Sequence, residues 1–173
     1  MNEMLVKNWN ETVSPDDVVV HCGDVALGPI RDSLEYIRRL NGYKILVTGN
    51  HDRNFRLGKR SAGLEPEQWD AEYIAAGFAE VHINYGAVID GIMFAVSHFP
   101  YDGDSHDGDR FEIARLFDDG TPLIHGHTHS HGHPLSHSRK GSTQIHVGVD
   151  AWGYRPVSED GILDIFHGTD RRE

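Results

Sequence analysis

The chain has 173 residues, enough for one domain with its own hydrophobic core. Its formal net charge of −11 repels the phosphate backbone of nucleic acids, so general nucleic-acid binding is not expected unless bound cations offset that charge. The sequence has one cysteine, no apolar run of about 18 residues and no secretory-signal pattern. These features predict a cytoplasmic protein without an internal disulfide or a membrane-spanning helix.

Helix and strand patterns alternate through the first half of the chain. Apolar residues four apart at Met1, Leu5, Trp9 and Val13 predict an amphipathic helix that ends at Ser14-Pro15. A long loop is predicted over 53–65, a segment with basic residues and two glycines. The other elements expected here are a strand over 18–22, a helix over 34–40, a strand over 44–48 and a helix from Pro66 to Gly77.

The second half of the chain is predicted to be richer in strands. Asp90-Gly91 is a strong signal for a two-residue hairpin turn between strands over 81–89 and 92–97. Residues 158–166 fit either a helix or a strand. A loop rich in Gly and Asp over 102–109, a helix near 110–117, and strands near 122–125 and 143–149 are expected in between. No linker is evident, so we predict one domain over 1–173 with a layered α/β fold.

Four predicted strands run directly into polar clusters rich in metal-ligand side chains. Ligands collect beyond the carboxyl ends of strands in α/β sheets. Each cluster alone has an ordinary explanation, such as a turn glycine or a helix cap, but four together favour one shared metal site. The clusters are His21-Cys22-Gly23-Asp24, Gly49-Asn50-His51-Asp52, Ser97-His98 and His125-Gly126-His127-Thr128-His129.

Four segments resemble, in order and at plausible spacing, four of the five motifs of the calcineurin-like metallophosphoesterases: Gly23-Asp24, Gly49-Asn50-His51-Asp52, Ser97-His98 and Gly126-His127-Thr128-His129. The resemblance implies an αββα sandwich of two mixed β-sheets. It also implies hydrolysis of phosphomonoesters or phosphodiesters by a metal-activated hydroxide, with diesters favoured for so small a chain. The family's first motif, an Asp-x-His on the opening strand, is absent, so we expect a domain that is N-terminally incomplete and lacks the first strand.

By this resemblance, Asp24 bridges two divalent metal ions. Asn50, His98 and His127 complete the ligands of one metal, and His129 binds the other. Oxygen and nitrogen ligands without a thiolate favour Mn²⁺, with Fe or Zn²⁺ as alternatives. A complete site holds two metals, and this chain is expected to hold one.

The same resemblance assigns roles near the substrate. His51 faces the phosphoryl group and protonates the leaving alkoxide, a task suited to a side chain with a pKa near neutrality. Asp52 belongs to the catalytic group as a residue that orients its neighbours. Arg53 either reaches the substrate phosphate, as arginine often does, or remains in solvent.

Several other residues have two open readings. His21 either replaces a missing metal ligand or packs in the core, and His125 is expected to support the neighbouring motif. The other histidines of the loop either contact substrate or are solvated: His131, His133 and His137. An acidic loop either binds a cation or is a solvated turn: Asp102, Asp104, Asp107 and Asp109.

Three functions are therefore compatible with the sequence. The first is a dimetal phosphoesterase acting on a phosphate-ester substrate. The second is a truncated or degenerate member of the same family, with one metal and little activity. The third is a non-catalytic interaction module on the same fold. This function is disfavoured by the intact segment Gly49-Asn50-His51-Asp52, because a scaffold has no need of His51. Substrate identity and oligomeric state are left open.

Overall fold

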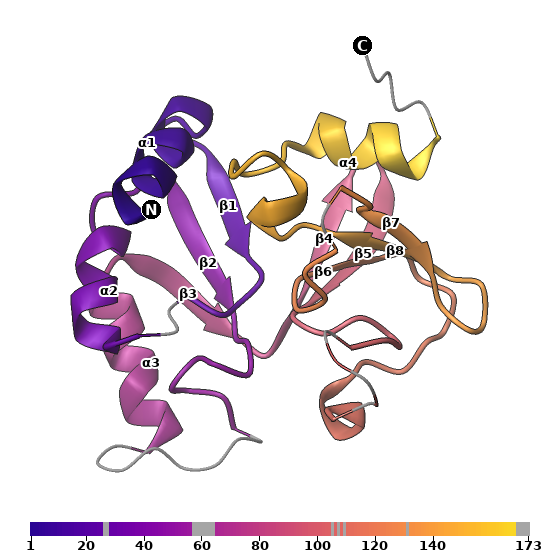
Figure 1. Ribbon diagram of the computed structural model, residues 1–173, viewed down its shortest axis with the longest axis horizontal. Coiled ribbons are helices and arrows are strands. Elements are labelled where there is room, and N and C mark those ends of the chain that lie inside the picture. The colour runs from indigo at the N-terminus through magenta and orange to yellow at the C-terminus, as the bar shows by residue number, and fades with distance from the viewer. Residues whose placement is uncertain are drawn as a thin grey trace. The chain divides into compact units, whose positions relative to one another are not determined.

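The computed structural model describes residues 1–25, 28–56, 65–104, 106, 108, 110–130 and 132–168. The chain divides into two compact units, Met1–Ile83 and Asn84–Glu173, called here the first and the second unit. Within the described ranges there are four α-helices and two β-sheets, one sheet in each unit (Figure 1). The α/β class expected from the sequence is confirmed.

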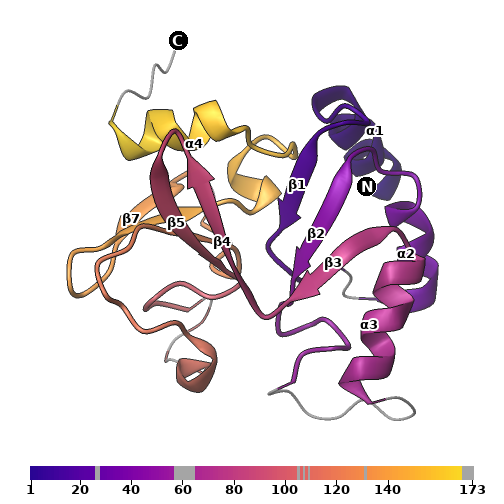
Figure 2. The same ribbon diagram turned by 180° about the vertical axis from the view of Figure 1, so that it is seen from behind.

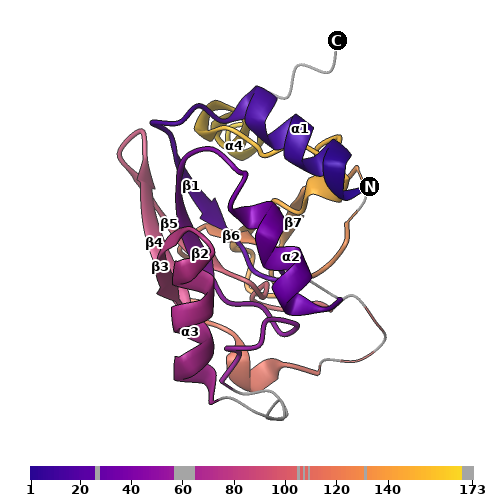
Figure 3. The ribbon, with the colours of Figure 1, turned by 90° about the vertical axis from the view of Figure 1, so that its left-hand side faces the viewer.

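The first unit is a three-stranded parallel sheet with the order β1-β2-β3. Its strands alternate along the chain with three helices, which lie side by side with the sheet in Figure 3. Two mixed sheets were expected from the sequence. This sheet is not mixed, because all three of its strands run parallel. The elements are α1 (Asn2–Thr12), β1 (Val18–His21), α2 (Ile30–Ile37), β2 (Tyr43–Val47), α3 (Pro66–Ala75) and β3 (Phe78–His82).

The core of the first unit lies where α2 and α3 pack on the central strand β2. Leu46 of β2 is fully buried among apolar side chains of both helices and Phe78 of β3. The periodicity that predicted α1 also holds, since its Trp9 is buried and donates a hydrogen bond from Nε1 to the carbonyl of Asn41 at 3.0 Å. Helices α2 and α3 thus form one hydrophobic cluster with strands β2 and β3.

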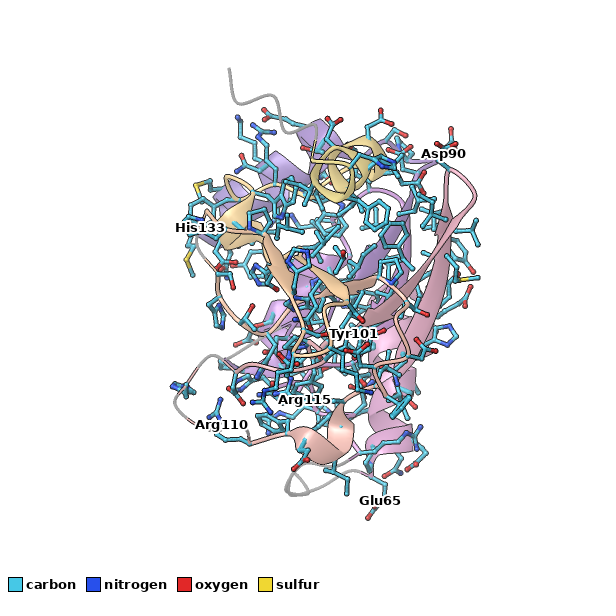
Figure 4. The ribbon with its side chains drawn as sticks, turned by 90° about the vertical axis from the view of Figure 1, so that its right-hand side faces the viewer. Glu65, Asp90, Tyr101, Arg110, Arg115 and His133 are labelled. Carbon is cyan, nitrogen blue, oxygen red and sulfur yellow. The ribbon has the colours of Figure 1, made fainter. Side chains whose placement is uncertain are left out.

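The second unit is a five-stranded mixed sheet with the order β4-β5-β6-β8-β7. Strands β4 and β5 form the antiparallel hairpin seen from behind in Figure 2, and its tip is the predicted turn at Asp90 (Figure 4). Strands β5, β6 and β8 are parallel, and β7 pairs antiparallel to β8. The elements are β4 (Asn84–Ile89), β5 (Ile92–Ser97), a 3-10 turn η1 (Glu112–Ala114), β6 (Leu123–His125), β7 (Leu135–His137), β8 (Thr143–His146), a 3-10 turn η2 (Val149–Ala151) and α4 (Glu159–Phe166).

The ambiguous segment 158–166 is a helix that packs on this sheet. Ser158 caps α4 by accepting a hydrogen bond from the backbone N–H of Gly161 at 3.2 Å. The ring of Phe166 meets the buried ring of Phe94 edge-on, with 5.3 Å between their centroids. Apolar residues on one face of α4 therefore cover the sheet, which a strand at this position would not do.

Three predictions about strands and helices were wrong. The predicted strand over 81–89 is two strands, because β3 ends at His82 in one sheet and β4 begins at Asn84 in the other. The alternating pattern continues through both strands, so it does not reveal the change of pairing partner. The predicted strand over 143–149 ends at His146, since the chain turns at Gly148, where an added Cβ would lie 2.5 Å from Asp150 Oδ1.

The third wrong prediction is the helix near 110–117, where the structure has only the 3-10 turn η1. Ile113 is 84% exposed and Phe117 is 79% exposed, so these apolar residues have no core to cover. Strand β7 inside the histidine-rich loop was not predicted, and its side chains are exposed. Among the described residues, no helix combines the length and apolar character required to cross a bilayer.

Leu46→Ala should lower the free energy of unfolding by about 2–5 kcal/mol, because it removes a fully buried side chain from the central strand and leaves a cavity. Chemical denaturation followed by circular dichroism measures this loss. Ile74→Ala on α3 is the matched control, since Ile74 is 43% exposed and its truncation should change stability by only about 0.5 kcal/mol. Equal losses in the two variants would contradict the assigned core.

Candidate metal centre

Candidate ligands of the first unit lie at one edge of its sheet. Asp24 follows β1, and Asn50, His51 and Asp52 follow β2. Strands β1 and β2 are parallel and in register from Val18↔Tyr43 to His21↔Leu46, so their carboxyl ends meet at the same edge. The segments 23–24 and 49–52 are called here the first cluster.

The carboxylate of Asp52 holds the two loops of the first cluster together. Its Oδ2 accepts hydrogen bonds from the backbone N–H of Asp24 at 2.9 Å and of Gly49 at 2.8 Å. Its Oδ1 accepts from the N–H of Val25 at 2.9 Å and from the hydroxyl of Tyr73 at 3.3 Å. Asp52 is only 5% exposed, and burial raises its pKa to about 6, although the three backbone N–H groups act in the opposite direction.

Asp24 is fixed in both backbone and side chain. Its φ of 57° lies in the left-handed region, which is costly for a residue other than glycine and often marks a functional site. Its Oδ1 accepts the backbone N–H of His51 at 2.8 Å. The half-buried carboxylate therefore has a set direction, as a metal-bridging ligand requires.

The two residues predicted to face the substrate lie on the surface. His51 and Arg53 are exposed, whereas Asn50 is half-buried. The backbone N–H of Arg53 donates to the hydroxyl of Tyr73 at 3.1 Å, so the main chain here is anchored to α3. The exposed imidazole of His51 therefore extends from a backbone that hydrogen bonds hold in place.

In the second unit, two candidate ligands meet directly. His98 follows β5 and His127 follows the neighbouring parallel strand β6, with a hydrogen bond of 3.1 Å from the N–H of Gly126 to the carbonyl of His98. His127 Nδ1 lies 3.2 Å from His98 Nε2, and both side chains are buried. Their rings pack against Phe99, with centroid distances of 4.8 and 4.9 Å.

The spacing of this histidine pair fits a shared metal ion. Imidazole nitrogens bind Zn²⁺ and similar ions at about 2.0–2.1 Å, which puts two ligands of one tetrahedral or octahedral ion about 3–3.4 Å apart. The observed 3.2 Å between the two ring nitrogens lies in that range. In the part of the chain that the structure describes, no group of three or more His, Cys, Asp or Glu side chains is placed to hold a metal ion by itself.

The remaining predicted ligand, His129, is placed differently. Its side chain is 68% exposed, and its Nδ1 lies 3.9 Å from Oδ2 of Asp150 in η2. Like Asp24 and His127, His129 has a positive φ, here 50°. The Gly-His-Thr-His segment thus turns sharply after β6 and directs one histidine inward and the other outward.

Asp104 contacts a candidate ligand, which its sequence position did not indicate. It was one of four acidic loop residues, and no spacing signal distinguishes it from the others. Its side chain is 2% exposed, and its Oδ1 lies 3.2 Å from Nε2 of His127. Burial alone would raise the pKa of Asp104, but hydrogen bonds from Arg110 and the charges of His127 and Arg110 hold the pKa below its usual range.

The other acidic residues of that loop differ from Asp104. Asp102 accepts the backbone N–H of Arg139 at 2.7 Å, whereas Asp107 and Asp109 lie outside the described residues. The solvated reading is therefore wrong for Asp104, because a histidine and two arginines enclose its carboxylate.

The other histidines of the predicted motifs have different surroundings. His125 is buried, donates from Nδ1 to the carbonyl of Gly126 at 2.8 Å, and has a pKa lowered by burial to about 3. His21 contacts Trp9 and Phe78 through its ring, at centroid distances of 6.3 and 6.0 Å, which favours packing over a ligand role. His133 and His137 are exposed, and His131 lies outside the described residues.

Comparison with known proteins identifies the family. The model of the calcineurin-like phosphoesterases matches residues 3–131. The Gene 66 protein of Mycobacterium phage L5 is 37% identical over 174 residues, covering 98% of this chain and 82% of that protein. The uncharacterized protein MJ1445 of Methanocaldococcus jannaschii is 26% identical over 170 residues, covering 95% and 74%.

A solved structure supports the fold. The structure of AQ665 from Aquifex aeolicus, a protein of unknown function, is similar with a TM-score of 0.65 and 25% sequence identity, covering 95% of this chain and 84% of that one. The family match spans most of the chain and includes Asp24, His51, His98 and His127. This chain therefore belongs to the calcineurin-like phosphoesterase family.

Proposed function

We propose that this protein is a metal-dependent phosphoesterase that hydrolyses phosphodiesters or phosphomonoesters. Family membership supports the reaction class. The observation that carries the proposal is the buried pair His98–His127, whose facing nitrogens are 3.2 Å apart, as two ligands of one metal would be. The single Cys22 is the ground on which a reducing, cytoplasmic compartment is proposed.

The proposed ligands come from the first cluster and from the segments that follow β5 and β6. When bound, divalent ions such as Mn²⁺, Fe or Zn²⁺ lower the pKa of water and offset the charge of the phosphate. The residue types suit these ions, because a carboxylate bridges, an amide oxygen adds a ligand without charge, and neutral imidazoles bind borderline metals. The proposed set is Asp24, Asn50, His98 and His127 for one ion, with Asp24 and His129 for a second.

His51 is the proposed general acid. Its side chain is exposed, and its backbone N–H donates to the Asp24 carboxylate at 2.8 Å, which fixes the start of the side chain beside a proposed ligand. Protonation of the leaving alkoxide by this imidazole would be general acid catalysis, the task that histidine performs most often in enzymes. Arg53 is also exposed and is proposed to contact a phosphate oxygen of the substrate.

Asp52 is proposed to position these groups rather than to react. Each of its carboxylate oxygens accepts two hydrogen bonds from the protein, so neither points freely at a substrate. It holds the backbone of Asp24 at a fixed distance from Gly49, the residue before Asn50. The metal affinity of the first cluster should therefore depend on it.

An enzyme with one firmly bound metal is the second candidate. These 173 residues contain no Asp-x-His motif ahead of Asp24, so the second proposed ion has only Asp24 and His129 as protein ligands. Its remaining ligands would be water, and its occupancy would be weak. The two candidates differ in metal stoichiometry and in rate.

His51→Ala should leave metal content nearly unchanged but lower the turnover of an activated phosphodiester by about 10²-fold or more, the usual effect of losing a general acid. Asn50→Ala should lower metal content and turnover together, because it removes a ligand. Elemental analysis and initial rates at saturating Mn²⁺ measure both effects. If His51→Ala strips the metal and Asn50→Ala does not, the two roles are assigned wrongly.

Asp52→Ala should lower both metal affinity and stability, because it leaves three backbone N–H groups without their acceptor. The expected loss in unfolding free energy is about 3 kcal/mol or more, since each buried donor left unsatisfied costs about 1–3 kcal/mol. Asp16→Ala, at an exposed turn of the same unit, should change stability by only about 0.5 kcal/mol. An Asp52→Ala protein as stable as the control would argue against the anchoring role.

The purified 173-residue chain should hold about one metal ion tightly and a second only at high concentration, because the second site has two protein ligands. Elemental analysis after dialysis and hydrolysis of an aryl phosphodiester at saturating Mn²⁺ test this. Activity should be low and should rise when an apolar strand ending in Asp-x-His is added before Met1. Two tightly held ions with full activity in these 173 residues would instead indicate a replacement ligand.

A further inference from the structure

The buried carboxylate of Asp104 lies where it can set the chemical form of His127. Its Oδ1 is 3.2 Å from His127 Nε2, and the two side chains are 2% and 3% exposed. A carboxylate only accepts hydrogen bonds, so the proton of a neutral His127 must be on Nε2 for this bond to form. The lone pair of the ring is then on Nδ1.

The freed lone pair points at the other histidine of the pair. His127 Nδ1 faces His98 Nε2 at 3.2 Å, the spacing that fits two nitrogens on one metal ion. The imidazole of His127 would thus lie between the Asp104 carboxylate at Nε2 and the proposed ion at Nδ1. Such an arrangement fixes the ring and raises the basicity of the ligand nitrogen.

The loop that carries Asp104 is itself held in place. Arg110 donates from Nη2 to Asp104 Oδ1 at 2.9 Å, and Arg115 Nη2 lies 4.0 Å from Oδ2. Arg115 is nearly buried and donates to the carbonyls of Pro100 and Gly103, each at 2.7 Å. Figure 4 labels both arginines in the second unit. Two cations keep the carboxylate paired, and the backbone bonds of Arg115 fix the turn that precedes it.

We propose that Asp104 is a positioning residue that holds His127 in the Nε2–H tautomer and so presents Nδ1 to a divalent metal. The proposal rests on the proposed metal-dependent function, but its effect on the tautomer exists without metal. It assigns a specific task to one residue of an acidic loop whose other described carboxylate, that of Asp102, contacts a backbone N–H instead.

The test combines two measurements on the same proteins. Co²⁺ is titrated into metal-free wild type, Asp104→Ala and Asp104→Asn, and the visible absorption of the bound ion gives its Kd and coordination geometry. In parallel, ¹⁵N NMR of the metal-free proteins at pH 8 shows which ring nitrogen of His127 carries the proton. Asp102→Ala is the matched control, since it removes a carboxylate from the same loop without touching His127.

Asp104→Ala should weaken the Kd for Co²⁺ by about 10–100-fold, the usual effect of losing an outer carboxylate partner, and should give a mixture of His127 tautomers. Asp104→Asn keeps the side-chain volume and an acceptor oxygen without the charge, so its Kd should lie between those of wild type and Asp104→Ala. Asp102→Ala should match wild type in both measurements. If Asp104→Ala does not fold, the Asn variant decides through its Kd.

The proposal is overturned if Asp104→Ala keeps the wild-type Kd and a single tautomer, or if Asp102→Ala weakens binding equally. A wild-type protein that binds no Co²⁺ would refute the proposed function instead. In that case the ¹⁵N comparison still decides whether Asp104 sets the form of His127.

Discussion

The first cluster depends on the hydrogen bonds that the buried carboxylate of Asp52 accepts. A strand end leaves the backbone N–H groups of the following loop without partners, and burial makes that costly. Asp52 accepts three such groups, two after β1 and one after β2, and so ties two loops to one side chain. Asp24 can then adopt its unfavourable left-handed conformation and present its carboxylate in one direction.

In the second unit, the buried polar groups at the strand ends are imidazoles. Parallel pairing of β5 and β6 brings His98 and His127 together, and Phe99 packs on both rings. Burial would leave two facing ring nitrogens poorly satisfied without a proton or a metal between them. The contact with Asp104 gives His127 a second polar partner, so both ring nitrogens of His127 have a defined neighbour.

The proposed metal ions would offset the net charge of −11 where an anionic ester is to bind. The proposed ligands include one carboxylate, an amide and three imidazoles, so bound divalent ions would leave the site locally positive. Two acidic side chains near the proposed ligands are paired with other groups: Asp52 with backbone N–H groups and Asp104 with two arginines and a histidine. General attraction of polyanions is not required for this chemistry.

The sequence by itself determined the fold class, the family and the candidate ligands. Apolar runs that end in Asp, Asn or His carry that information locally, and a motif such as Gly-Asn-His-Asp needs no knowledge of its neighbours. Only the tertiary structure decided which strands pair with one another. For example, β3 and β4 follow each other in the chain but belong to different sheets. Alternation of apolar and polar residues indicates which face of a strand is buried, but not which strand lies beside it. The tertiary structure also decided that Asp104, and not Asp102, meets a histidine, since a contact across 23 residues between a loop and a strand end has no periodicity to reveal it.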